Sequence, residues 1–492
     1  MTEFLVEHLD PTTLAVVLRE YLLRALMVVL ILVRKGSRPS VASGWMVLVL
    51  ALPVLGTVLY FSLGETRFGR RRIRRHREVL ARIDRPAFHE FGDPAVRTPR
   101  LGQVERELST LAESVSHGVV CGGNRIELTH ETDDTIASMI AAIDGAAHHC
   151  HLLFYIWLDD GTGRRMAEAM LRAAARGVEC RVLVDAVGSK GFLRSATCRR
   201  LRDGGVRVVA ALPVNLLRMV FSRIDLRNHR KILVVDGVIG FTGSQNIADA
   251  AFAPKAKFAP WVDCMVRIEG PAVRELQMIF VVDWCLDAPH DGSDMDLDAI
   301  LSIEPPAHPD GVPAQVLATG PNYQVDAITQ LVQGLVQSAH RELVLTTPYF
   351  VPDQATLTNF TVTARRGIDV HLVVPARNDS RLVGLASRSL FGPLLDAGVS
   401  IEEYHGGLLH AKTVVVDETI GVVMSANLDL RSYELNFECG VLVYDADFAR
   451  RLRALQRHYQ SKSTPVPADR WRTRPFRVRL AQGVASVLSP LL

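Results

Sequence analysis

Two short stretches of the chain repeat one pattern of residues that could carry out chemistry. Residues 228–237 read NHRKILVVDG, and residues 409–418 read LHAKTVVVDE. In each, a histidine precedes a lysine by two positions, and an apolar run then leads to an aspartate. The sequence holds only seven lysines, so two in matching places argue against a chance match. The candidate catalytic residues are His229, Lys231, Asp236, His410, Lys412 and Asp417.

These residue types suit transfer of a phosphoryl group. Side chains two apart on a β-strand share a face, so we expect each histidine to lie beside its lysine. One neutral imidazole can attack phosphorus, and a second imidazolium can protonate the departing alkoxide. Lysine ammonium groups would neutralise the non-bridging phosphate oxygens in the transition state. The pattern predicts a two-step transfer through a phosphohistidine, with no metal and no cofactor, because no cluster has metal-ligand spacing.

The elements around the two stretches also occur twice. Residues 164–177 are rich in helix formers and end in glycine, and a strand is expected over 178–188. The same arrangement is expected over 357–367 and 368–376. In both copies a further strand and then the His-x-Lys stretch follow. This order predicts an α/β protein with two copies of one domain, whose halves together form a single pocket.

The N-terminal region is apolar enough to predict a membrane anchor. Residues 41–63 contain no charged side chain. A helix of this length can cross about 30 Å of hydrocarbon. Trp45 and Tyr60 lie near the ends of this segment, where aromatic rings favour the headgroup layer. We expect a clear transmembrane span here.

A second apolar segment precedes it. Residues 12–33 are apolar except for Arg19, Glu20 and Arg24, and the last two are spaced to pair on one helix face. We expect a second span over 12–33, with an interfacial helix as the alternative.

Arginines follow the expected span and set its orientation. Seven occur within residues 66–77, at Arg67, Arg70, Arg71, Arg72, Arg74, Arg75 and Arg77. Because basic residues stay on the cytoplasmic side, we expect a multi-pass protein of the cell membrane with cytoplasmic catalytic domains. The odd, scattered set of seven cysteines is typical of reduced thiols in a cytosol-facing protein.

Taken together, these features resemble the phospholipase D superfamily with its paired HKD motifs, and within it the bacterial cardiolipin synthases. The resemblance covers nearly the whole chain. Besides the two stretches above, it rests on FYIWLDD (154–160), VECRVLVDAVGS (178–189), TPYFVPD (347–353), SANLDLRSYELNFE (425–438) and SPLL (489–492). It implies two tandem phospholipase D-like α/β/α sandwich domains with mixed sheets, preceded by transmembrane helices.

The expected organisation follows from composition and from this resemblance. The predicted parts are a membrane anchor (1–66), a basic juxtamembrane linker (67–100), a first phospholipase D-like domain (101–290), a linker (291–312), a second such domain (313–468) and a basic and apolar C-terminal segment (469–492). The last segment is expected to be interfacial, with docking onto the protein body as the alternative.

The resemblance also implies supporting site residues. Phosphate contacts are expected from Ser244, Asn246, Ser425 and Asn427, and histidine-orienting carboxylates from Asp263 and Glu438. Surface or capping roles are the alternative for the two carboxylates. Met424 and Val262 depart from the family pattern: we expect Met424 to narrow the pocket floor beside Ser425, and Val262 to remove a headgroup contact. Tyr349 and Phe350, between two prolines, are expected either to be buried or to face the lipid headgroup.

The activity that the resemblance implies is transfer of a phosphatidyl group from one phosphatidylglycerol to another, which yields cardiolipin and releases glycerol. The expected partners are phospholipid substrates and the membrane, and not nucleic acid; the oligomeric state and the nucleophilic histidine stay open. The alternatives are a membrane-bound phospholipase D that uses water or another alcohol, and a catalytically inactive scaffold. The intact histidines and lysines argue against the scaffold.

Overall fold

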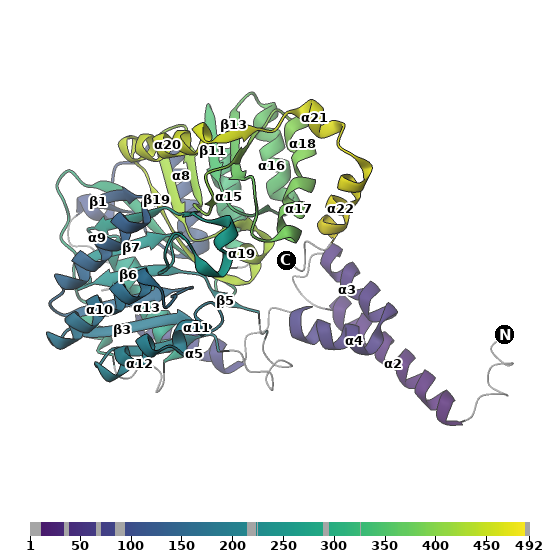
Figure 1. Ribbon diagram of the computed structural model, residues 1–492, viewed down its shortest axis with the longest axis horizontal. Coiled ribbons are helices and arrows are strands. Elements are labelled where there is room, and N and C mark those ends of the chain that lie inside the picture. The colour runs from purple at the N-terminus through teal and green to yellow at the C-terminus, as the bar shows by residue number, and fades with distance from the viewer. Residues whose placement is uncertain are drawn as a thin grey trace. The chain divides into compact units, whose positions relative to one another are not determined.

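The computed structural model describes residues 11–33, 39–64, 70–83, 94–213, 223, 225–288, 295–324 and 326–487 (Figure 1). The chain forms two compact units. One consists of Met1–Arg71 with Val214–Asp225, and the other of Arg72–Pro213 with Leu226–Leu492. All the candidate catalytic residues belong to the second unit, which we call the catalytic unit.

The first unit is helical. Its elements are α2 (Pro11–Val33), α3 (Pro39–Ala51), α4 (Pro53–Leu59) and a π-helical turn, η1 (Tyr60–Gly64). Trp45 and Tyr60 pack edge to face, with ring centroids 5.6 Å apart, and Met27 of α2 is buried in the same cluster. The expected pairing of Glu20 with Arg24 is confirmed, with 2.8 Å between Arg24 Nη2 and Glu20 Oε1.

The two expected membrane spans are not confirmed as such. Within the part of the chain that the structure describes, no single helix has both the length and the apolar character needed to cross a bilayer. The segment 41–63 is not one helix, because proline has no backbone N–H and disfavours helical geometry in the residue before it. The break falls at Leu52, where φ is −132°, and Pro53 starts α4.

The catalytic unit contains two halves with a similar order of elements. The first half comprises β1 (Cys121–Thr129), α9 (Thr132–Asp144), β2 (His149–Phe154), α10 (Gly161–Ala175), β3 (Glu179–Asp185), α11 (Lys190–Leu193), α12 (Ala196–Asp203), β4 (Arg207–Ala211), β5 (Arg227–Asn228), β6 (Lys231–Val235), β7 (Ile239–Gly243), η3 (Ala253–Phe258), β8 (Trp261–Val262), β9 (Met265–Glu269) and α13 (Val273–Asp287).

The second half comprises β10 (Val312–Thr319), α15 (Ala327–Gln337), β11 (Glu342–Thr346), β12 (Phe350–Val351), α16 (Gln354–Arg365), β13 (Asp369–Pro375), α17 (Arg381–Ser389), α18 (Phe391–Asp396), β14 (Ser400–Tyr404), β15 (Leu408–Leu409), β16 (Thr413–Val416), β17 (Ile420–Met424), β18 (Leu428–Asp429), α19 (Leu430–Glu434), β19 (Asn436–Val443) and α20 (Ala446–Ser461). The helices and strands expected over 164–188 and 357–376 are confirmed as α10, β3, α16 and β13.

The remaining elements flank or connect the halves. They are α5 (Arg70–Ile83), α7 (Pro94–Arg97), α8 (Gln103–Ser116), α14 (Leu297–Leu301), β20 (Ser463–Pro465), α21 (Ala468–Arg472) and α22 (Phe476–Val487). The ends of several predicted segments (among them 291–294 and 488–492) lie outside the described residues, so the predicted domain borders stay a prediction.

One mixed sheet runs through both halves. Its strand order is β20-β14-β13-β11-β16-β17-β19-β10-β1-β9-β7-β6-β2-β3-β4. In each half three strands are parallel (β2-β3-β4 and β11-β13-β14), and the strand after the His-x-Lys stretch pairs antiparallel to the first of them. The halves join where β1 pairs antiparallel with β10. The repeat expected from the sequence is therefore present as one continuous sheet with helices on both faces.

The strands that follow the histidines are buried on both sides, as their apolar runs predict. In β6, Ile232 and Val234 face a core covered by α13 and α20, whereas Leu233 and Val235 face a core covered by α9, α10 and α12. The α13 and α20 side forms one cluster that extends through both halves. This shared core holds the ends of β6 and β16 in fixed relation, so the residues before them can meet.

Two of the arginines that follow the expected span have partners within the protein. Arg72 of α5 donates to both carboxylate oxygens of Asp287, at 2.6 and 3.0 Å, and Arg75 donates to the carbonyl of Ala288 at 3.2 Å. Arg67 lies outside the described residues. At least part of this basic segment therefore docks on α13.

Candidate active site

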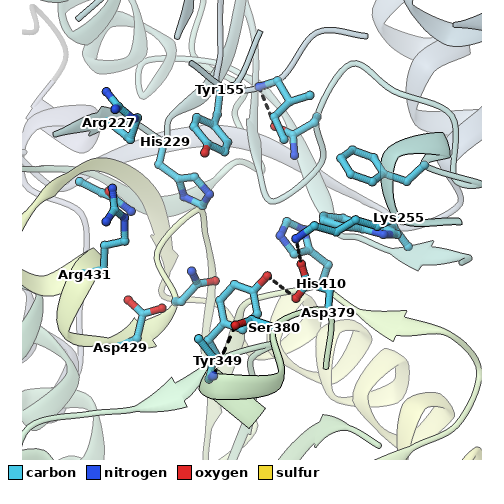
Figure 2. Close-up of a pocket in the computed structure, with 18 of the residues that line it drawn as sticks. Tyr155, Arg227, His229, Lys255, Tyr349, Asp379, Ser380, His410, Asp429 and Arg431 are labelled. Carbon is cyan, nitrogen blue, oxygen red and sulfur yellow. Dashed lines mark hydrogen bonds and ion pairs between the residues drawn. The ribbon is translucent and has the colours of Figure 1, made fainter. Parts of the chain in front are cut away.

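The two motif histidines line one cavity of about 450 Å³ between the halves of the catalytic unit. Figure 2 shows His229 and His410 on opposite sides of it. His229 follows β5 and precedes β6, and His410 occupies the equivalent place between β15 and β16. Both are buried, at 8% and 3% exposure. The structure thus brings together the two residues that the sequence repeat predicted to share a pocket.

Each histidine is held by backbone pairing with the opposite half. β5 pairs with the start of β19, and β15 pairs with β8. The His229 backbone N–H donates to Phe437 O at 2.9 Å, and that of His410 donates to Val262 O at 2.8 Å. Each half thus supplies the backbone acceptor for the histidine of the other half, so neither half can form its own histidine site alone.

The carboxylates cross in the same way. His229 Nδ1 lies 2.9 Å from Glu438 Oε2, and His410 Nδ1 lies 2.7 Å from Asp263 Oδ1. Asp263 belongs to the same half as His229, yet it contacts the other histidine. Each carboxylate that was expected to orient a histidine therefore contacts the histidine of the other half.

A serine steadies each carboxylate. Ser244 Oγ donates to Asp263 Oδ1 at 2.6 Å, and Ser425 Oγ donates to Glu438 Oε2 at 2.5 Å. Both hydroxyls donate to the carboxylate that holds a histidine, and the direct phosphate contact expected of the serines stays a prediction.

The carboxylates fix which histidine nitrogen carries the proton. Burial would raise the pKa of Asp263 and of Glu438, but the adjacent imidazole, lysine and serine outweigh it and lower each pKa to about 2. An ionised carboxylate can only accept a hydrogen bond, so Nδ1 of each histidine must donate. The lone pair is then on Nε2, on the ring edge away from the carboxylate.

Burial also keeps both imidazoles neutral. It lowers the pKa of His229 to about 4, with Glu438 opposing and Lys231 adding to the shift. Burial also lowers the pKa of His410 to about 4; Lys412 adds to this shift and Asp263 opposes it. A neutral imidazole is a nucleophile, so either ring is prepared to attack phosphorus at neutral pH.

The lysines lie beneath the histidines. Lys231 Nζ donates to the carbonyl of His229, and Lys412 Nζ donates to that of His410 at 2.6 Å. Burial lowers the pKa of Lys231 to about 8 and that of Lys412 to about 7, although Asp263 and Glu438 favour the charged forms. An anion between the histidines would stabilise both ammonium groups.

Asn246 and Asn427 line the cavity, as expected of phosphate contacts. The Asn246 side-chain oxygen accepts the Ile156 N–H at 3.1 Å, which leaves its amide NH₂ to donate elsewhere. Among the described residues, the buried Asn427 Oδ1 has no hydrogen-bond partner. The orientation of Asn246 therefore fits an anionic group, whereas the phosphate contact expected of Asn427 stays a prediction.

Asp236 and Asp417 do not lie in the cavity. Asp236 accepts the backbone N–H groups of residues 147–149, each at 2.8 Å, and Asp417 accepts those of residues 340–342 at 2.8 to 2.9 Å. Both are at the far end of the strand that the histidine begins. The catalytic role predicted for them is replaced by fixing the start of the neighbouring strand, β2 or β11.

Sequence reasoning missed several residues that line the cavity. Tyr155 and Trp261 place their rings 4.8 and 4.6 Å from the rings of His229 and His410, respectively. The others missed are Arg227, Lys255, Asp379, Asp429 and Arg431. Tyr155, Asp429 and Arg431 occur inside the family-like segments, and Arg227 directly precedes the first His-x-Lys stretch, so a signal was present. No motif marks Lys255 or Asp379.

Two doubts raised by the sequence are resolved by position. Tyr349 lines the cavity and donates to Asp379 Oδ1 at 2.7 Å, whereas Phe350 is fully buried. Met424 and Val262 are not among the residues that line the cavity. The side chains at these two positions therefore lie outside the cavity wall.

One group of possible metal ligands occurs among the described residues, away from the cavity. The ligating atoms of Glu342, Asp369 and His371 lie within 4.8 Å of one another. Arg453 already binds both carboxylate oxygens of Glu342, at 2.9 and 2.7 Å. This group is better described as an ion-pair network.

Comparison with known families agrees with this geometry. The family model described as cardiolipin synthase, phospholipase D-like domain, matches residues 139–284 and 332–459, one segment in each half. The chain belongs to this cardiolipin synthase family. A second model, the phospholipase D-nuclease N-terminal region, matches residues 25–65.

Relatives match over nearly the whole chain. It is 36% identical over 473 residues to cardiolipin synthase A of Edwardsiella ictaluri, covering 96% of this chain and 97% of the relative. It is 37% identical over 481 residues to cardiolipin synthase A of Yersinia pseudotuberculosis, with the same coverage of each chain. The crystal structure of the Haemophilus influenzae phosphatidylserine synthase shares the fold, with a TM-score of 0.59 and 15% identity over 80% of this chain and 100% of that one.

Proposed function

We propose that the protein is a phosphatidyltransferase that makes cardiolipin from two molecules of phosphatidylglycerol and releases glycerol. The observation that carries the proposal is the pair of neutral, carboxylate-held imidazoles that line one cavity from opposite halves. Near-full-length similarity to proteins named cardiolipin synthase A supports the choice of substrate.

In the first half-reaction, one histidine Nε2 attacks the phosphorus of a phosphatidylglycerol. A phosphorus–nitrogen bond forms, and the bond from phosphorus to the glycerol oxygen breaks. The other histidine, protonated on binding, gives its proton to the leaving oxygen. Lys231 and Lys412 offset the charge on the non-bridging oxygens, in a buried site where such interactions are strong.

In the second half-reaction, the histidine that lost its proton takes one from a hydroxyl of the acceptor phosphatidylglycerol. The alkoxide attacks phosphorus, and the phosphorus–nitrogen bond breaks. The attacking histidine is released neutral, and the other histidine is again protonated and returns its proton to solvent when cardiolipin leaves. Asp263 and Glu438 stabilise the imidazolium form of whichever ring is charged, because each accepts the Nδ1–H of its histidine.

We also propose that residues 12–63 attach the protein to the cell membrane, with the catalytic unit on the cytoplasmic side. Large apolar side chains of α2 are exposed, among them Leu22 (69%) and Tyr21 (64%). Surfaces of this kind mark contact with lipid or protein. Attachment would hold the enzyme and both lipid substrates in one plane and raise their effective concentration.

The test uses the purified full-length protein in detergent with labelled phosphatidylglycerol. Cardiolipin and free glycerol in equal amounts are expected. Phosphatidic acid alone would identify a phospholipase D that uses water, and no turnover would identify an inactive scaffold.

A further inference from the structure

The C-terminal helix α22 carries a concentration of exposed apolar side chains. Phe476, Leu480, Val484 and Val487 are each more than half exposed, and we call them the apolar stripe. Within the described part of the catalytic unit they make up half of the large apolar side chains that are exposed, and the others are scattered elsewhere. Single exposed apolar residues are ordinary, whereas a contiguous patch marks a surface that contacts lipid or another protein.

The stripe occupies one side of the helix, and basic residues lie on both sides of it. Because an α-helix turns about 100° per residue, the four apolar side chains fall within about 80° of one another. By the same geometry, the exposed Arg477 lies beyond one edge of the stripe and the exposed Arg479 beyond the other. The sequence of α22 contains no carboxylate. This arrangement is typical of helices that lie in the headgroup layer of a bilayer.

The opposite side of α22 is held against the protein, where α22 packs on α17 (Figure 1). Gln482 and Ala485 on this side are buried. Ala485 packs in one apolar cluster with Ala386 of α17 and Val351 of β12, and Val383 of α17 contacts the same cluster. Val351 and Val383 also line the active-site cavity. The surface on which α22 rests is therefore built from the same elements as one wall of the cavity.

We propose that α22 is a membrane-docking helix of the catalytic unit, whose apolar stripe inserts into the surface of a bilayer that contains anionic lipid. Such a bilayer offers acyl chains to the stripe and anionic headgroups to Arg477 and Arg479, so it accounts for both features of the helix. The inference goes beyond the attachment proposed for residues 12–63, because it concerns the catalytic unit itself. Since α22 and the cavity share α17, docking would keep the cavity close to the layer that contains its lipid substrates.

The first experiment measures whether the stripe lies in lipid. A fluorophore is attached to the cysteine of Val484→Cys in the full-length protein, which is reconstituted in vesicles of phosphatidylcholine and phosphatidylglycerol. All seven native cysteines are buried, so the label should react with the introduced one. Val362→Cys on α16 is the matched control, because Val362 and Val484 are similarly exposed, at 49% and 53%. Quenching by iodide in water is compared with quenching by a nitroxide on the lipid acyl chain.

We expect the acyl-chain nitroxide to quench the label at position 484 at least about threefold more than the label at position 362, and iodide to show the reverse order. A label at position 484 that iodide quenches as well as it does at position 362 would overturn the proposal. So would a label shielded from both quenchers, which would show that protein covers the stripe. Neither result depends on which reaction the cavity performs, so failure of the proposed function stays distinguishable.

The second experiment measures what docking does for turnover. The double variant Leu480→Asp with Val484→Asp places two carboxylates on the stripe, and Val362→Asp is the control. Turnover of phosphatidylglycerol in vesicles is divided by turnover of a short-chain phosphatidylglycerol dispersed in water. We expect this ratio to fall about tenfold in the double variant and to stay within about twofold in the control. An unchanged ratio, or an equal loss on both substrates, would overturn the proposal, since equal loss would mean that α22 only supports the cavity wall.

Discussion

The two halves of the catalytic unit share a plan and differ in what faces the substrate. Both use the same strand order, bury a lysine beneath a histidine and lend the other half a serine-held carboxylate. Around the histidines they diverge: an aromatic ring of the first half contacts each histidine, Tyr155 on His229 and Trp261 on His410.

The difference separates two kinds of requirement. Transfer through a covalent histidine needs two similar imidazoles, because each step uses one as nucleophile or leaving group and the other as acid or base. Recognition needs no symmetry, because the donor and the acceptor present different groups. We propose that the residues shared by the two halves serve the chemistry and that the divergent residues serve the choice of substrate.

The largest expected effect tests the equivalence of the histidines. His229→Ala and His410→Ala should each lower kcat by at least about a thousandfold, because neither half-reaction can proceed with one imidazole. Initial rates of cardiolipin formation measure this, with circular dichroism as a control for folding. If one variant kept a tenth of the activity, the halves would not share one reaction.

The crossed carboxylates should give the next largest effect. Glu438→Gln and Asp263→Asn should each lower kcat about a hundredfold, because the histidine loses the partner that stabilises its charged form. Since Glu438 raises the pKa of His229, its loss should lower that pKa further and leave His410 nearly unchanged. Titration of isotopically labelled histidines by NMR measures the pKa values of His229 and His410. Asp263→Asn is the matched control and should change the pKa of His410 instead. If each substitution changed the pKa of the histidine in its own half, the contacts between each carboxylate and the histidine of the other half would be contradicted.

The lysines should set the alkaline limit of activity. Because the pKa is lowered to about 7 for Lys412 and about 8 for Lys231, kcat/KM should fall as pH rises through this range and the ammonium groups lose their protons. A bound phosphodiester is negative and raises both pKa values, so the decline in kcat should occur at higher pH. Rates measured from pH 5 to 10 test whether kcat/KM declines at a lower pH than kcat. Coincident declines, or full activity at the alkaline end, would show that the charged lysines do not act on the phosphate.

The smallest effect on chemistry is expected from the motif aspartates. Asp236→Asn or Asp417→Asn weakens three backbone hydrogen bonds, which should lower the free energy of unfolding by about 1–3 kcal/mol. Thermal melts should show a Tm lower by a few degrees, and kcat well below the Tm should stay within about threefold. A hundredfold loss of kcat in a folded variant would restore the catalytic role predicted from the motif.

Much of the fold and the centre of the site could be predicted from the sequence. Apolar runs predicted the buried strands β6 and β16, and the repeated pattern predicted that His229 and His410 would share a pocket. Both predictions depend on local spacing and on symmetry, which a sequence displays directly.

The rest depended on contacts between distant residues. The exchange of Asp263 and Glu438 follows from the pairing of β8 with β15 and of β5 with β19, which no local pattern encodes. The roles of Asp236 and Asp417 required knowing which backbone groups lie opposite each strand end. The helix expected over 41–63 failed at Pro53 because hydropathy alone does not register a missing backbone donor.

A direct measurement would trap the intermediate. The enzyme would be mixed with labelled phosphatidylglycerol, quenched in base, which preserves phosphorus–nitrogen bonds, and digested for mass spectrometry. A phosphatidyl group on one of the two motif histidines, absent when that residue is alanine, is the predicted result. A label on serine or lysine, or turnover with no labelled histidine at any time, would contradict two imidazoles acting on one phosphorus.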